Sequence, residues 1–505
     1  MIANYQKDLF NQLQETINKV DALIEENRLL KSEIILLKEN QQKEICSLKK
    51  EIAKSEALHK KEVEVLQLEN IQLKKENKRL KDIINKDSSN SSKPPSSDGF
   101  KKITSTREKT ENKLGGQKGH KGKVPILFDH PTEIIEHKES VCTCGGNVHY
   151  KGEYAAKQVV DVELVTHIKE HRVFQGVCSS CGAKVNGNFP EGVINTITYG
   201  NNLKSLIALL SVEGCISINR TRKIVCEMTD GLVNLAEGTI VNFNKELAKS
   251  LLPVIESLKD SLIASPVNHK DETGIRMNKH TRWLHVLSNS KRTLYYYHEK
   301  RGNDADNDAG VLPLYSGTLV HDHLKGLYRF TCAHAECNAH ILRYLKGVME
   351  SNQRLWAQKM AELLTRANDD IKERKLNGES LFNKETLARY SKEYDQILEN
   401  GFCEFLQSES PDYNGDDMKL LRRLKEYKKE HLLFLFDFNV PFDNNQAERD
   451  LRMIKAKAKI SGCFRSEDGI STFAKIKSYT STLKKNKRNI YQGIHLAFEG
   501  NPVIL

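Results

Sequence analysis

Apolar residues recur every seven positions along residues 1–86, in two interleaved rows, and no proline or glycine interrupts them. This spacing is typical of the a and d positions of a coiled coil. Asparagines at a positions lower stability but favour a parallel, in-register dimer. The alternative is a long helix that packs on the rest of its own chain. The rows consist of Val20, Asn27 and Ile34 with Leu23, Leu30 and Leu37, and of Val63, Asn70, Asn77 and Ile84 with Leu66, Leu73 and Leu80.

The heptad pattern stops at Asp87, where the chain becomes rich in serine, proline and glycine. Such a segment cannot continue a helix. Residues 87–125 therefore read as a linker, and its later part is strongly basic, with Lys118, Lys121 and Lys123 among glycines. Glycines allow close approach of the backbone, and lysines neutralise phosphates. We expect an arm that follows DNA, although a solvated linker has the same composition.

Two cysteine pairs dominate residues 126–192. They are Cys142-x-Cys144 and Cys178-x-x-Cys181, and a glycine follows each pair. Four thiolates on tight turns would hold a structural Zn²⁺. The alternating residues 159–177 predict strands that bring the pairs together. His137 and His149 are possible replacement ligands, and the alternative is a set of thiols without metal.

Helical periodicity returns over residues 193–265, at 203–214 and 246–263. Residues 216–247 predict two short helices around a turn. That arrangement suits a DNA-binding helix-turn-helix, but two packed helices are the commoner explanation.

Residues 266–345 change to strand patterns. We expect three antiparallel strands, the first with Asp271 in its middle, then a helix at 303–313. A strand that ends at Asp322 follows, and then a short strand and a helix. This order matches the ribonuclease-H-like plan, in which the two aspartates are neighbours. The three strands are predicted at 267–273, 281–289 and 292–300, the fourth at 315–322, and the last strand and helix at 331–345.

A third acid, Glu448, lies in the segment 437–505, beyond a helical insertion at 346–436. Asp443 or Asn444 can cap the helix that carries it. Arg452 and Lys455 follow at i+4 and i+7, on the same helix face. Such a face can hold a metal and grip a phosphate backbone, although an ordinary solvated helix has similar charges.

Three carboxylates on these elements suit phosphodiester chemistry with two Mg²⁺ (or Mn²⁺) ions. The net charge of +11 over 505 residues suits a polyanionic partner. No run of eighteen apolar residues exists, so we expect no membrane span. The eleven cysteines form no dense framework, which indicates a reducing compartment.

Several blocks of the sequence resemble the transposases of the insertion-sequence-66 family, a DDE-type group of bacterial mobile elements. They are NSSKPPSSD (90–98), GGQKGHKG (115–122), the cysteine knuckle, DETG (271–274), CNAH (337–340) and DNNQAERDLR (443–452). The resemblance implies that Asp271, Asp322 and Glu448 are metal ligands and that Cys337 and His340 support the catalytic core. It also implies an all-helical insertion, accessory proteins of the same element, and a cytoplasmic, nucleoid-associated location in bacteria.

We therefore predict a multidomain α+β protein. It has an N-terminal coiled coil, a zinc-knuckle module, a helical DNA-binding region and a ribonuclease-H-like core with an all-helical insertion. The expected function is transposition. The chain would bind double-stranded DNA at element ends and target as a homodimer or higher oligomer, and would catalyse metal-dependent cleavage and strand transfer. The alternatives are a non-catalytic DNA-binding dimer with a degenerate nuclease fold, and a coiled-coil scaffold.

Overall fold

The computed structural model divides into two units, Met1–Lys86 and Asp87–Leu505. The predicted linker 87–125, with Lys118, Lys121 and Lys123, lies almost entirely outside the described residues. Those residues are 2–91, 126–139, 141–150, 152, 154–408 and 412–504.

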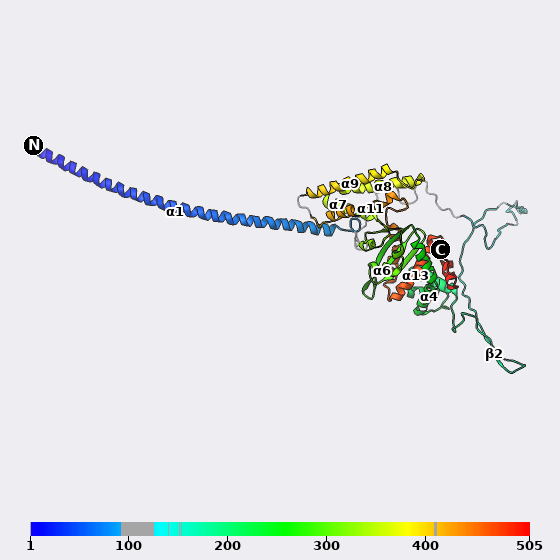
Figure 1. Ribbon diagram of the computed structural model, residues 1–505. Coiled ribbons are helices and arrows are strands. Elements are labelled where there is room, and N and C mark those ends of the chain that lie inside the picture. Colours follow the sequence, from blue (N-terminus) through cyan, green and yellow to red (C-terminus); the bar gives the residue numbers. More distant parts are fainter. Residues whose placement is uncertain are drawn as a thin grey trace. The chain divides into compact units, whose positions relative to one another are not determined.

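The first unit is one helix, α1 (Ile2–Asn85), which confirms the predicted helix over this segment (Figure 1). Its heptad leucines are about half exposed, for example Leu30 at 50% and Leu66 at 58%. Because the helix leaves these side chains in contact with solvent within its own unit, the pairing with a second chain stays a prediction.

Regular structure is sparse between residues 126 and 198. A short hairpin joins β1 (Gln175–Val177) to β2 (Lys184–Asn186), and one isolated bridge joins Val141 to Asn147. The prediction of strands over 159–177 was therefore wrong except for its last three residues. Residues 159–172 alternate, but they form no ladder with another segment of the described chain, and their apolar side chains stay exposed. A strand needs both a partner and a surface to cover.

Four helices and one π-helical turn follow, as the pattern over 193–265 predicted. The π-turn, η2, continues the first helix directly. The two short helices expected over 216–247 are present as α3 and α4. The elements are α2 (Asn201–Ala208), η2 (Leu209–Glu213), α3 (Ile218–Met228), α4 (Glu237–Ser250) and α5 (Leu252–Ile263).

A five-stranded mixed sheet carries the middle of the second unit, in the order β5-β4-β3-β6-β7. The first three strands are antiparallel, whereas β6 joins β3 and β7 joins β6 in parallel. The predicted sequence of strands is thus confirmed. The strands are β3 (Val267–Met277), β4 (His280–Ser288), β5 (Thr293–His298), β6 (Thr318–His321) and β7 (Ala333–Glu336).

The connection from β5 to β6 is less helical than expected. The helix predicted over 303–313 ends at Ala309, and a separate 3₁₀ turn, η3, covers Leu312–Leu314. Gly310 follows α6 (Asn303–Ala309) with φ +76°, the left-handed conformation that terminates many helices. Another 3₁₀ turn, η4 (Lys325–Arg329), lies between β6 and β7.

Helices from the last part of the chain pack against the sheet. α12 (Asn445–Ser461) and α13 (Glu467–Lys485) share an apolar core with β3, β4 and β5, and α14 (Ile490–Phe498) follows them. The α13 hydroxyls also cover the free edge of β5. Ser478 Oγ accepts from the Tyr295 N–H at 2.8 Å, and Thr482 Oγ1 accepts from the Thr293 N–H at 3.1 Å. A sheet edge that would otherwise expose unpaired N–H groups is thereby satisfied.

The insertion is helical in its described residues, as predicted, and α8 and α9 run side by side (Figure 1). Its helices form a second apolar core with Val320 of β6 and Ala335 of β7. No helix in the described ranges is long and apolar enough to cross a bilayer. The helices are α7 (Asn338–Asn352), α8 (Leu355–Leu376), α9 (Lys384–Leu406), α10 (Asp416–Glu426) and α11 (Lys428–Phe436).

Candidate active site

Asp271 and Asp322 lie at the same level on neighbouring parallel strands. In the β3–β6 ladder, His269 pairs with Val320, so the positions two residues further on each strand are Asp271 and Asp322. Asp322 directly follows the last residue of β6. The parallel register therefore brings together two carboxylates that are far apart in the sequence.

Both aspartates line a cavity of about 240 Å³. Burial, together with the charges of Asp322 and Glu272, raises the pKa of Asp271 to about 8. Burial would also raise the pKa of Asp322, but hydrogen bonds from His340 and Asn444 hold it below its ordinary value. One carboxylate is thus kept charged while the other resists losing its proton. The other lining residues are Lys270, Glu272, Arg301, His321, His323, Leu324 and Leu327.

Asn444 connects three elements at this site and is fully buried. Its Nδ2 donates to the Lys270 carbonyl at 2.8 Å and to Asp322 Oδ1 at 3.3 Å, while its Oδ1 pairs with His269 Nδ1 at 3.0 Å. The residue stands at the N-cap position of α12 but makes no cap hydrogen bond with its side chain. Asp443 takes that role, since its Oδ1 accepts from the Asn445 N–H at 3.0 Å.

Glu448 lies one turn into α12, outside the lining of the 240 Å³ cavity. Its ion-pair partner is Arg343 of α7, with Nη2 at 3.8 Å from Oε1. That oxygen is buried and has no hydrogen-bond partner within the described part of the chain. The structure therefore places Glu448 on the expected helix but does not bring it into one group with the two aspartates.

Cys337 and His340 lie beside Asp322. One ligand atom from each of the three residues falls within 4.8 Å of the others, and no other described His, Cys, Asp or Glu residues form such a group. Buried Cys337 accepts from the Asn444 N–H through Sγ at 3.2 Å. Although burial opposes a charged imidazole, the contacts with Asp322 and Cys337 raise the pKa of His340 to about 11. His340 Nδ1 lies 3.3 Å from Asp322 Oδ1, within ion-pair distance, and Arg343 Nη1 donates to the other ring nitrogen of His340, Nε2, at 3.0 Å.

The chemistry of this donor set fits a divalent cation. Asp271 and Asp322 repel each other, and the buried Glu448 Oε1, which has no hydrogen-bond partner among the described residues, lies on the adjoining helix. A hard cation accepts oxygen ligands of this kind and offsets their repulsion. Asp271 and Asp322 line one cavity and could supply oxygen ligands to such a cation.

Sequence reasoning missed Lys270, the residue before Asp271. Its ammonium is fully buried, 2.9 Å from His285 Nδ1, 3.4 Å from Asp306 Oδ1 and 3.7 Å from Glu272 Oε2. Nothing in the sequence indicates that Lys270 is buried among these groups, because His285 and Asp306 come from β4 and α6.

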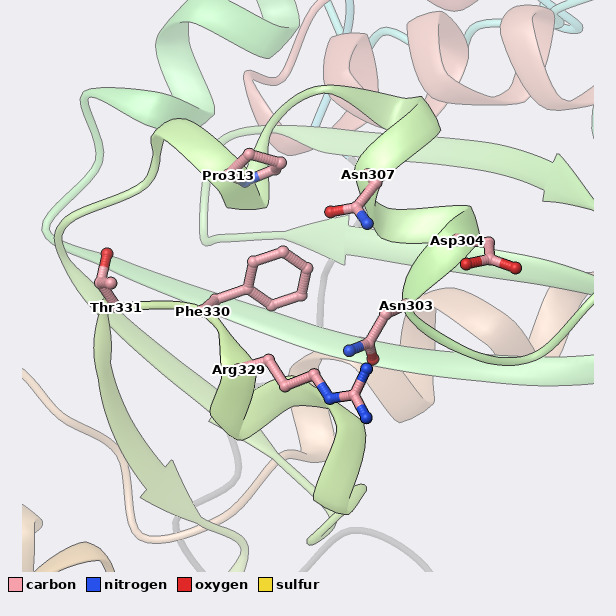
Figure 2. Close-up of a pocket in the computed structure, with 7 residues that line it drawn as sticks. All are labelled: Asn303, Asp304, Asn307, Pro313, Arg329, Phe330 and Thr331. Carbon is pink, nitrogen blue, oxygen red and sulfur yellow. The ribbon is translucent and has the colours of Figure 1, made fainter.

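A larger cavity of about 330 Å³ is lined by residues of α6, η3 and the end of η4, and the Phe330 ring lies between Arg329 and Pro313 (Figure 2). Its one carboxylate, Asp304, is paired with Lys300 at 2.8 Å. Since it has no second acid, its chemistry does not suit a cation pair. The remaining lining residues are Asn303, Asn307 and Thr331.

The four knuckle cysteines lie on two separate turns that the structure does not gather into one group. Each turn ends in a left-handed glycine, Gly145 with φ +87° and Gly182 with φ +70°. A hydrogen bond from the backbone N–H of Cys144 lowers the pKa of the Cys142 thiol. A hydrogen bond from the backbone N–H of Ser180 likewise lowers the pKa of the Cys178 thiol. Each turn therefore favours a thiolate at its first cysteine, while the assembly of both pairs around one ion stays a prediction.

The predicted phosphate contacts on α12, Arg452 and Lys455, are exposed, as a DNA-facing role requires. The helix itself is anchored to the preceding helical region. Lys457 Nζ donates to the Ser211 carbonyl in η2 at 2.9 Å, and Cys215 Sγ contacts the Met453 carbonyl at 3.8 Å. A movement of that region would therefore reach the helix that carries Glu448.

Comparison with known proteins gives two family matches. The transposase IS66 family matches residues 196–472, and a family of unknown function (DUF6444) matches residues 13–124. No curated protein matches the chain. The first match covers more than half of the chain, including both aspartates, the insertion, α12 and the first residues of α13. The chain therefore belongs to the IS66 family of transposases and has a transposition-related activity on DNA.

Proposed function

We propose that this chain is a DDE-type transposase whose ribonuclease-H-like core cleaves and joins DNA with Asp271, Asp322 and Glu448. The observation that carries the proposal is the pairing of β3 with β6, which sets Asp271 beside Asp322. The strand order β5-β4-β3-β6-β7 also supports the proposal. The late helix α12, which carries the third acid, Glu448, shares an apolar core with β3, β4 and β5.

Asp271 and Asp322 would hold Mg²⁺ or Mn²⁺, and Glu448 would complete the ligand set. When bound, two such ions activate the attacking oxygen and stabilise the leaving oxygen of a phosphodiester. The chain's own groups do the positioning. Asn444 orients Asp322 by a hydrogen bond, and His340 Nδ1 lies 3.3 Å from the same carboxylate oxygen. Arg452 and Lys455 would hold the phosphate backbone on the exposed side of α12, with Lys118, Lys121 and Lys123 of the linker farther along the DNA.

The partners follow from the same proposal. Element ends and target DNA would be bound as double strands, by a dimer joined through α1 or by a higher assembly. Cys142, Cys144, Cys178 and Cys181 would hold a structural Zn²⁺, and the lowered pKa of Cys142 and of Cys178 supports this assignment. Small accessory proteins encoded by the same mobile element would assist transposition, which would take place at the nucleoid.

The deciding experiment is a strand-transfer assay with labelled element-end DNA, in Mg²⁺ or in EDTA. Asp271→Asn, Asp322→Asn and Glu448→Gln keep the size of each side chain and remove its charge. Each is expected to lower joining at least a hundredfold. Asp304→Asn, in the larger cavity, is the matched control and should join at the wild-type rate.

Metal-independent joining, or an Asp271→Asn variant that joins as fast as wild type, would exclude this mechanism. Tight, salt-sensitive DNA binding without any joining would favour the non-catalytic dimer.

A further inference from the structure

Glu336, the last residue of β7, is a carboxylate with no exposed side-chain surface and no part in the proposed metal site. Arg423 binds its Oε2 with two donors, Nη2 at 2.5 Å and Nε at 3.1 Å. The Tyr328 hydroxyl donates to Oε1 at 2.6 Å, and His323 Nδ1 contacts the same oxygen. These partners hold the pKa of Glu336 well below its usual range despite its burial.

The partners come from two different parts of the fold. Arg423 belongs to α10 of the helical insertion, and His431 of α11 lies 3.6 Å from Oε2. His323 and Tyr328 belong to the connection between β6 and β7. Glu336 is therefore the point where the insertion and this connection meet: Arg423 of the insertion donates twice to Oε2, whereas His323 and Tyr328 of the connection contact Oε1.

The connection begins at the metal-ligand candidate itself. His323 directly follows Asp322 and has φ +59°, a left-handed conformation that a non-glycine residue adopts rarely. It contacts the Glu336 carboxylate, the Tyr427 ring, which meets the imidazole edge-on at 4.6 Å, and the Tyr328 ring at 6.0 Å. Tyr427 lies between α10 and α11, so the contacts with Glu336 and Tyr427 lead to residues that the insertion positions. A residue in a rarely populated conformation persists when its surroundings over-determine it, and such residues cluster at functional sites.

We propose that the helical insertion sets the conformation of Asp322, with Arg423, Glu336 and His323 as positioning residues. This inference rests on the proposed function, since Asp322 is taken as a metal ligand. The insertion would then be part of the catalytic apparatus and not a spacer. A partner or DNA segment that displaced α10 would change the affinity of the site for its metal.

The test uses the full chain and measures Mn²⁺ binding without DNA, by calorimetry, together with the Mg²⁺ dependence of joining. His323→Gly keeps the left-handed backbone accessible but removes the imidazole. It is expected to raise the half-saturating metal concentration about tenfold, with the joining rate at saturating metal changed less than threefold. His323→Asn, which tolerates φ near +60°, should recover part of the affinity. Asp395→Asn, which removes an exposed insertion ion pair with Lys428, is the control and should leave both readouts unchanged.

A second variant tests the link from the insertion. Arg423→Gln, measured with amide hydrogen exchange, should speed exchange of residues 321–330 at least tenfold while the β3–β5 amides stay protected. If Arg423→Gln unfolds the protein, Glu336→Gln with Arg423→Gln removes both buried charges and serves instead. Unchanged exchange in the connection, or His323→Gly with wild-type Mn²⁺ affinity, would overturn the inference. A wild-type chain that binds no Mn²⁺ would overturn the proposed function, and the exchange comparison would still decide whether the insertion fixes this connection.

Discussion

The side-chain amide of Asn444 donates to Asp322 Oδ1 at 3.3 Å, although 122 residues separate the two. The same amide nitrogen also binds the Lys270 carbonyl, one residue before Asp271. A single buried side chain therefore sets the distance between both aspartates and the start of the helix that carries Glu448.

Two replacements of Asn444 should distinguish its contribution to stability from its contribution to DNA joining. Asn444→Ala leaves the Lys270 carbonyl and His269 without their partner, which is expected to lower the free energy of unfolding by about 1–3 kcal/mol. Asn444→Asp keeps the size but sets a third carboxylate against Asp322. We expect it to lower joining more than Asn444→Ala does, at saturating Mg²⁺. Equal activity in the two variants would contradict an orienting role for the amide.

The buried histidines predict acid sensitivity of the unit Asp87–Leu505. Burial lowers the pKa of His285 to about 2, of His321 to about 3 and of His431 to about 4. Their depressed values mean that stability is fully present above the ordinary histidine pKa and is lost as pH falls. Between pH 6 and 5 these three histidines together bind almost three more protons in the unfolded than in the folded chain, so their contribution to the free energy of unfolding falls by about 4 kcal/mol.

Tryptophan fluorescence can follow this loss. The chain has two tryptophans, Trp283 in β4 and Trp356 in α8, so the signal reports on the second unit and not on α1. The urea midpoint should fall steeply from pH 7 to pH 5. A constant midpoint would mean that these histidines are protonated in the folded protein.

Lys477 of α13 forms a buried ion pair with Glu213 of η2, with 2.6 Å between Nζ and Oε1. Lys477→Met leaves that carboxylate without its cation and is expected to lower the free energy of unfolding by about 3–5 kcal/mol. Lys484→Met, an exposed lysine of the same helix, is the matched control. Urea unfolding of both variants at pH 7 decides the point, and a Lys477→Met midpoint equal to the control's would refute it.

The exposed leucine row of α1 predicts self-association. Leu30→Lys with Leu37→Lys sets charges at two d positions and should convert the dimer to a monomer in sedimentation equilibrium. Glu25→Lys with Ser32→Lys adds lysines outside the two rows and should leave the dimer intact. If both double variants keep the wild-type mass, the chains associate through another surface.

Local patterns predicted the elements of the core well. Alternation and helical spacing located the strands, both aspartates and the helix of Glu448, because each signal lies within a few residues. The contacts that organise the site are distant in sequence. Glu336 meets Arg423 across 87 residues, and no periodicity relates an acid at the end of a strand to an arginine in an insertion.

The wrong strand prediction over 159–177 has the related cause that alternation cannot supply a partner strand. Asn444 was predicted as a possible helix cap. It holds the cap position, but its side chain serves the aspartates instead.

The covered edge of β5 has a consequence for biosynthesis. The Ser478 hydroxyl that accepts from the Tyr295 N–H lies 183 residues later in the chain. At translation rates of about 5–20 residues per second, β5 waits roughly 10–40 s on the ribosome before α13 exists to cover it. During that interval its N–H row is open to strands of other nascent chains. Aggregation of this protein should therefore be decided while it is still being made, and slower synthesis of the last third should lower the yield of native chain.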